Sequence, residues 1–90
     1  MDEKSLRNYE KDIIKTVVNK KIKTISFRNP HLSLGDITRG ISLRDTLKAL
    51  KGLKDAGILS LKPKKACLFF YRSVYKTDLD EAGKAYHSIQ

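Results

Sequence analysis

The stretch SLRDTLKALKGLKDAGILSLKPKK, residues 42–65, decides how this chain folds. Its first half spaces apolar residues three and four apart, which predicts a helix whose buried stripe holds Leu43, Thr46, Leu47, Leu50 and Leu53. Ser42 is a suitable N-cap, and Gly57 is well placed for a left-handed C-terminal cap. The segment ILSLK then alternates apolar and polar residues. We therefore expect a helix over residues 42–56 that leads directly into a strand.

Downstream of this stretch, the sequence predicts a hairpin and a last helix. KPKK, residues 62–65, reads as a turn with proline, and ACLFFYRSVY is rich in residues that favour strands. TDLDEAGKAYHSIQ then forms a helix with apolar residues on one face. Thr77 and Asp80 are both possible N-caps for it, and the sequence does not decide between them.

Upstream, three shorter elements are expected. Residues 5–20 have helical spacing with Ser5 as N-cap, and residues 22–27 alternate as in a short strand. Asn29-Pro30 ends that strand. A short helix over residues 34–39, capped by Ser33, comes next and ends in a turn at Gly40. With no repeat or linker in 90 residues, the chain is expected to form one domain, residues 1–90.

The formal net charge of +9 is unevenly placed. Residues 13–30 and residues 58–76 each hold five basic side chains and no acidic one, whereas residues 1–12 and 77–90 are mildly acidic. Lysines scattered for solubility give no reason for this sorting, but a face that binds a polyanion does. The bulk charge therefore favours a nucleic-acid partner over a merely solvated surface.

The sequence offers little for catalysis or cofactor binding. His31 and His87 lie far apart in no metal-ligand spacing, and no phosphate loop is present. We therefore expect no enzyme activity, no cofactor, no metal and no small-molecule ligand. Cys67 is interpreted as a buried strand residue, with an intersubunit disulfide as the alternative. The absence of a long apolar run or a signal peptide predicts a cytoplasmic protein away from membranes.

The order helix, short strand, helix, turn, helix, hairpin, helix resembles the winged helix-turn-helix family. LGDITRGIS, residues 34–42, looks like the second helix and turn of that family, and LKGLKDAGILSLK, residues 50–62, looks like its exit from the recognition helix into the wing. VYKTDLDEAGKAY, residues 74–86, is similar to the junction before the last helix in MarR-like and PadR-like regulators, although it has extra residues before Leu79 and Asp80 in place of threonine. The small size also resembles winged-helix proteins of archaea and their viruses. The resemblance implies an α+β winged-helix fold and a DNA-binding transcription regulator.

Such a protein would read double-stranded DNA with the helix over residues 42–56. Arg44 is the residue best able to pair bidentately with guanine, while Asp45 can accept a bond from cytosine or serve within the helix cap. Other side chains are expected on phosphates, on bases or in an adjacent groove. The predicted DNA-binding residues are Arg39, Ser42, Arg44, Asp45, Thr46, Lys48, Lys51 and the wing lysines Lys62, Lys64 and Lys65.

Two further questions concern partners. A core of this size has limited room for the apolar stripes of both terminal helices, so a homodimer surface is predicted at Tyr9, Ile13, Val17, Tyr86 and Ile89. The alternative is that these residues simply close the monomer core. The rival function is a winged helix used for protein or RNA contact, because Phe69, Phe70, Tyr71 and Tyr75 could stack on unpaired bases.

Overall fold

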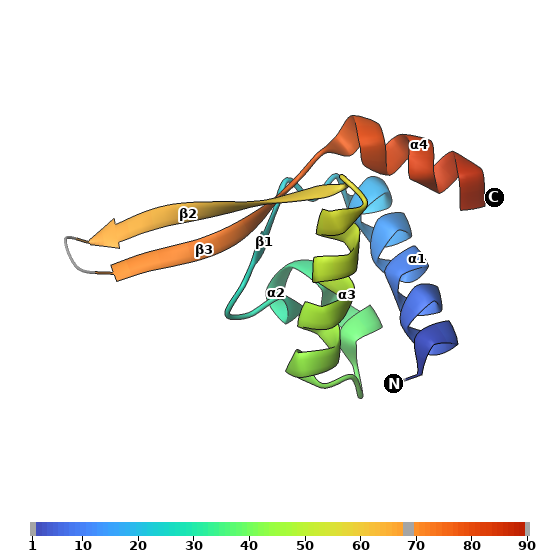
Figure 1. Ribbon diagram of the computed structural model, residues 1–90, viewed down its shortest axis with the longest axis horizontal. Helices are drawn as coiled ribbons and strands as arrows, with labels where there is room; N and C mark the ends of the chain where they lie inside the picture. Colours follow the sequence, from blue (N-terminus) through green and yellow to red (C-terminus); the bar gives the residue numbers. More distant parts are fainter. Residues whose placement is uncertain (1, 68–69, 90) are drawn as a thin grey trace.

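The computed structural model describes residues 2–67 and 70–89, with the backbone alone at residues 63–67 and 70–73. These residues form an α+β structure with four α-helices, a short 3-10 helix and one three-stranded antiparallel sheet (Figure 1). The predicted order of elements is confirmed. The elements are α1 (Glu3–Lys20), β1 (Thr24–Ser26), α2 (His31–Leu34), the 3-10 helix η1 (Gly35–Thr38), α3 (Leu43–Asp55), β2 (Leu59–Cys67), β3 (Phe70–Thr77) and α4 (Leu79–Ile89).

The sheet has the order β1-β3-β2, and its long β2–β3 hairpin projects away from the helices (Figure 1). Ile25 of β1 and Leu61 of β2 both pair with Tyr75 of β3. The prediction that residues 62–65 form the turn is wrong, because Lys62 pairs with Val74 inside β2 and the ladder continues to Cys67 and Phe70. A proline is tolerated there because β2 is an edge strand with one free side.

The hydrophobic core lies where α1, α3 and α4 meet the base of the sheet. Ile13 and Val17 of α1, Leu50 of α3, Ile25 of β1 and Leu34 of α2 are almost completely buried. Burying one such side chain contributes about 1.5–3 kcal/mol. The helices therefore hold the sheet base in place, and the outer hairpin extends beyond their cover.

Helix α1 begins earlier than the sequence predicted. Its N-cap is Asp2, whose Oδ1 accepts a 2.7 Å hydrogen bond from the backbone N–H of Ser5. Ser5 is therefore inside the helix, and the prediction that it caps the helix is wrong. The carboxylate also favours the positive end of the helix dipole, and this hydrogen bond lowers the pKa of Asp2.

The segment after β1 also differs from the prediction of one helix over residues 34–39. Helix α2 starts directly after Pro30, whose fixed φ suits a helix start, and it ends at Gly35 with φ +69°. A separate 3-10 turn follows. Ser33 does not cap a helix, since its hydroxyl donates to the Thr24 carbonyl at 3.3 Å.

Helix α3 has the predicted ends. The Ser42 side chain accepts a 3.1 Å hydrogen bond from the N–H of Asp45, which confirms the N-cap. Gly57 has φ +84° and donates its N–H to Lys54, while the next residue, Ile58, donates to Leu53. This paired bonding satisfies the last carbonyls of the helix and turns the chain into β2.

Gly52 marks the contact between α3 and α1. A Cβ at this position would overlap the Glu10 carboxylate, so the close neighbour of Gly52 is a side chain of α1. Partial burial here raises the pKa of the Glu10 carboxyl, and the positive charge of Arg7 opposes this effect.

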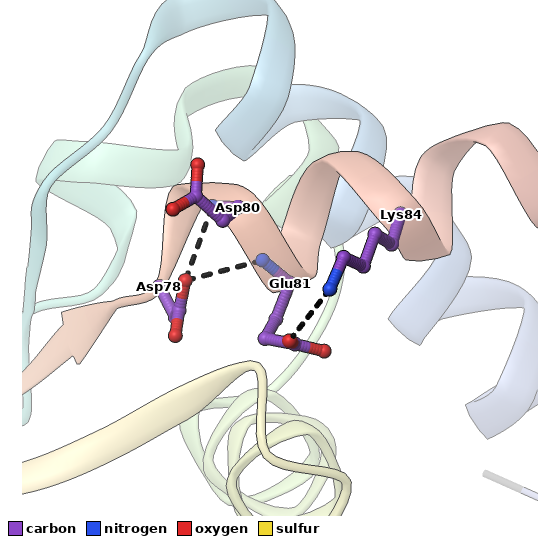
Figure 2. Close-up of polar contacts among 4 residues, drawn as sticks. All are labelled: Asp78, Asp80, Glu81 and Lys84. Atoms are coloured by element: carbon purple, nitrogen blue, oxygen red, sulfur yellow. Dashed lines mark hydrogen bonds and ion pairs between the residues drawn. The ribbon is translucent and has the colours of Figure 1, made fainter.

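Helix α4 uses neither of the two expected N-caps. The Oδ1 atom of Asp78 accepts the backbone N–H of both Asp80 and Glu81 at 3.1 Å (Figure 2). Thr77 is 7% exposed and still belongs to β3, where its backbone N–H donates to Lys23. Thr77 is therefore the last residue of β3 and not the N-cap of α4.

Candidate functional site

Helix α3 separates a buried face from a basic face. Thr46, Ala49, Leu50 and Leu53 face the core. Leu43, predicted to be buried, is 45% exposed, and Leu47 is half-buried, so the buried stripe is rotated relative to the leucine pattern. Thr46 lies on the buried side, where its hydroxyl makes a 3.0 Å hydrogen bond with the buried hydroxyl of Tyr9 on α1.

The basic face of α3 lines an open groove of about 400 Å³ against the sheet. Four of its lining residues are cationic and come from α3. We call this the α3 groove; it is formed by Phe27, Arg44, Leu47, Lys48, Lys51, Lys54 and Tyr75.

Two aromatic rings form the sheet side of the α3 groove. Phe27 follows β1 and stacks on Tyr75 of β3, with ring centroids 5.7 Å apart and planes inclined by 30°. Phe27 is 37% exposed, whereas Tyr75 is 3% exposed. Phe27 is therefore the aromatic surface that a molecule in the groove would meet, and Tyr75 supports it from behind.

The four cations of the α3 groove form no ion pair with any described residue. Among the described residues, the ion pairs join Arg7 to Glu3, Arg39 to Asp36, and Lys84 to Glu81, and all lie outside this groove. Four unneutralised positive charges on one helix face repel one another, and an approaching polyanion relieves that repulsion.

The N-terminal end of α3 carries three of the predicted DNA-binding residues. Arg44 is exposed and lines the groove. Ser42 is exposed but serves as the N-cap, and Asp45 is half-buried with its N–H donated to that cap. Arg39 is exposed near α3 but outside the groove lining, and its contact with Asp36 is long at 3.8 Å.

Thr46 is the clear correction among the predicted DNA-binding residues. Its side chain has no exposed surface and bonds to Tyr9 inside the core. Thr46 could reach a ligand in the groove only if its hydrogen bond to Tyr9 broke and the core around it opened. Arg44, Lys48 and Lys51, in contrast, lie together in the lining of the α3 groove.

The wing lysines do not join the α3 groove as a group. Side chains alternate along a strand, so Lys62 faces away from the sheet side that holds Leu61 and Tyr75. It lines a different hollow of about 470 Å³, which we call the outer hollow, formed by Lys23, Ser60, Lys62, Lys76, Thr77, Asp78 and Leu79. The side chains of Lys64, Lys65 and Cys67 lie outside the described residues, as does Phe69.

Three of the five predicted dimer residues are also corrected. Tyr9, Ile13 and Val17 are at most 3% exposed within the single chain, so they belong to its core and not to its surface. α1 packs these residues against α3 and α4. Tyr86 and Ile89 on α4 are half-buried and keep some accessible apolar surface.

Sequence reasoning missed several residues that line the two basic hollows. Lys54 follows Lys51 by three residues and could have been found from helical spacing. Phe27, Lys23 and Lys76 could not, because their places depend on the pairing of β1 with β3. Strand register brings together residues that are about 50 positions apart in the chain.

Over residues 2–67 and 70–89, no helix is long and apolar enough to cross a membrane. Within the same ranges, no three His, Cys, Asp or Glu side chains gather in an arrangement that could hold a metal ion. Comparison of the chain with protein-family models, curated proteins and solved structures found no match.

Proposed function

We propose that this chain is a winged-helix domain that binds double-stranded DNA in a sequence-specific manner and acts as a transcription regulator rather than an enzyme. In this proposal α3 is the recognition helix and the β2–β3 hairpin is the wing. The supporting observation is the α3 groove, where four cations of one helix face, none of them in an ion pair with a described residue, lie beside an exposed aromatic ring.

The dimensions of α3 suit a major groove. Thirteen helical residues span about 20 Å, and a major groove about 12 Å wide accepts a helix. Arg44 lies in the first turn of α3, where side chains of an inserted helix reach base edges. Lys48 and Lys51 follow on the same face at the spacing of successive turns and are assigned to phosphates.

Selection of bound duplexes from a random pool tests this assignment. Arg44→Ala should weaken binding to the preferred sequence by about 1–3 kcal/mol and relax the preference at one base pair, because a bidentate contact to guanine is lost. Lys51→Ala is the matched variant on the same helix face. It should weaken all duplexes to a similar extent, since a phosphate contact carries no sequence information.

Two results would count against this function. If Arg44→Ala and Lys51→Ala gave the same profile across sequences, α3 would not be the reading helix. If the wild-type protein enriched no sequence at all, the sequence-specific regulator would be excluded, leaving general duplex binding.

A second candidate function is contact with single-stranded nucleic acid, with RNA or with a protein. The observation that favours it is Phe27, an exposed aromatic ring among the groove cations on which an unpaired base could stack. A competition between duplex and single strand separates the two functions. If stacking on Phe27 matters, Phe27→Leu should reduce single-strand binding and leave duplex binding unchanged. If stacking does not matter, Phe27→Leu should leave the preference between duplex and single strand unchanged.

A further inference from the structure

The outer face of the sheet carries a second basic surface, separate from the α3 groove. In the register of the sheet, Lys76 lies between Thr24 and Ser60, and Lys62 follows on the same face two residues after Ser60. Lys23, just before β1, meets these two lysines at the outer hollow. Three segments that are distant in sequence thus bring three lysines to one place.

The charge of the outer hollow is positive overall. All three lysines are exposed, and among the described residues none of them belongs to an ion pair. The acidic lining residue is Asp78, whose carboxylate already accepts two backbone N–H groups at the start of α4 (Figure 2). Ser60 adds an exposed hydroxyl that can donate to a phosphate oxygen.

The two basic surfaces face in different directions. Tyr75 on the inner face of β3 forms a wall of the α3 groove, while its neighbour Lys76 points to the opposite face. In Figure 1 the base of the hairpin lies above the end of α3, and the start of α4 lies above that base. A duplex seated along α3 would therefore leave the outer hollow, close to the base of the hairpin, facing away from it.

We propose that the outer hollow binds the phosphate backbone of a second DNA duplex, so that one chain bridges two duplex segments. This inference rests on the proposed binding of the first duplex by the α3 groove. The chemistry at the outer hollow is sequence-independent, because lysines and a serine hydroxyl can neutralise and bond phosphates without reading bases.

A capture experiment tests the bridge. One duplex that carries the preferred sequence is immobilised and loaded with the full-length protein, and retention of a second, labelled duplex of unrelated sequence is measured. The test variant is Lys23→Gln/Lys76→Gln, two exposed lysines of the outer hollow, and the matched control is Lys4→Gln/Lys15→Gln, two exposed lysines of α1. Thermal unfolding confirms that each variant folds.

Bridging predicts that the wild-type and the control retain the second duplex, while the test variant retains at least about tenfold less and binds the first duplex with unchanged affinity. Equal losses for both duplexes would overturn the inference, because Lys23 and Lys76 would then contact the first duplex. The inference would also be overturned if the test variant still captured the second duplex, since a dimer with two α3 grooves would then explain the bridge.

Failure of the inference is distinguishable from failure of the proposed function. If the wild-type protein binds the immobilised duplex but captures no second one, only the bridge is wrong; if it binds neither, both proposals are wrong. Acetylation of lysines in the wild-type complex gives an independent readout. Lys23 and Lys76 should become protected only after the second duplex is added, and protection by the first duplex alone would contradict the bridge.

Discussion

Thr46 shows how a buried polar residue joins α3 to α1. Its hydroxyl and that of Tyr9 form a hydrogen bond in the core, on the face of α3 opposite to the cations of the α3 groove. Burial raises the pKa of Tyr9, with the hydrogen bond to Thr46 acting in the other direction. The pair thus links α1 to the side of α3 that lies behind the proposed binding face.

Replacement of Thr46 by valine should destabilise the fold without changing the binding chemistry. Thr46→Val leaves the Tyr9 hydroxyl buried without its partner, which costs about 1–3 kcal/mol in the free energy of unfolding. Urea denaturation measures this loss. Tyr9→Phe in the same chain should recover part of it, because no unpaired hydroxyl then remains.

Duplex affinity of the folded Thr46→Val variant should equal that of the wild-type, since Thr46 has no exposed surface. If the fully folded Thr46→Val variant bound duplex more weakly than the wild-type, the direct contact between Thr46 and DNA that the sequence predicted would be supported.

At the scale of elements, the connection from α3 to β2 depends on backbone conformation at one position. Gly57→Ala should destabilise the protein by about 1 kcal/mol, because φ is +84° there and L-residues with a Cβ disfavour this region. No described atom lies within 4 Å of an added Cβ, so a steric clash does not contribute. Thermal or chemical unfolding measures the effect.

Gly83→Ala is the matched control, since Gly83 is inside α4 and an added Cβ there is equally free of described neighbours. It should stabilise the protein by about 0.5–1 kcal/mol through helix propensity. Effects of the same sign for both substitutions would contradict the conformational explanation.

The elements that could be predicted from the sequence are those set by local chemistry. Ser42 and Gly57 act on residues within a few positions, so both ends of α3 followed from the sequence. The hairpin turn did not, because KPKK has the composition of a turn but the pairing of Lys62 with Val74 extends the strand through it. A non-local ladder outweighed the local preference.

The same distinction applies to the candidate site. Arg44, Lys48 and Lys51 share a helix face, which sequence spacing alone predicts. Thr46 does not share that face; its spacing places it in the buried stripe, where it bonds to a partner 37 residues away. The grouping of Lys23, Lys62 and Lys76 in the outer hollow depends on strand register, which the sequence did not define.

At the scale of the whole molecule, we propose a homodimer that joins copies through α4. Tyr86 and Ile89 retain accessible apolar surface, whereas the buried residues of α1 do not. A two-fold axis would place two copies of α3 about 34–36 Å apart and would require a pseudo-palindromic site.

Sedimentation equilibrium at micromolar concentration tests the dimer. The wild-type protein should show twice the chain mass of 10.3 kDa, and Ile89→Ser should shift it to the monomer while the far-ultraviolet dichroism of the fold is retained. A wild-type monomer would remove the dimer and the palindrome, but would leave the α3 groove as a binding surface for a single site.

The salt dependence of duplex binding tests the α3 groove most directly. We predict that the logarithm of the association constant falls linearly with the logarithm of salt concentration, since each neutralised phosphate releases counterions. Lys48→Gln/Lys51→Gln should reduce the magnitude of that slope by about 1.8, or about 0.9 per lost contact, and Lys4→Gln/Lys15→Gln on α1 should leave it unchanged. A flat wild-type dependence, or an equal reduction for both pairs of variants, would contradict the assignment of the α3 groove to DNA.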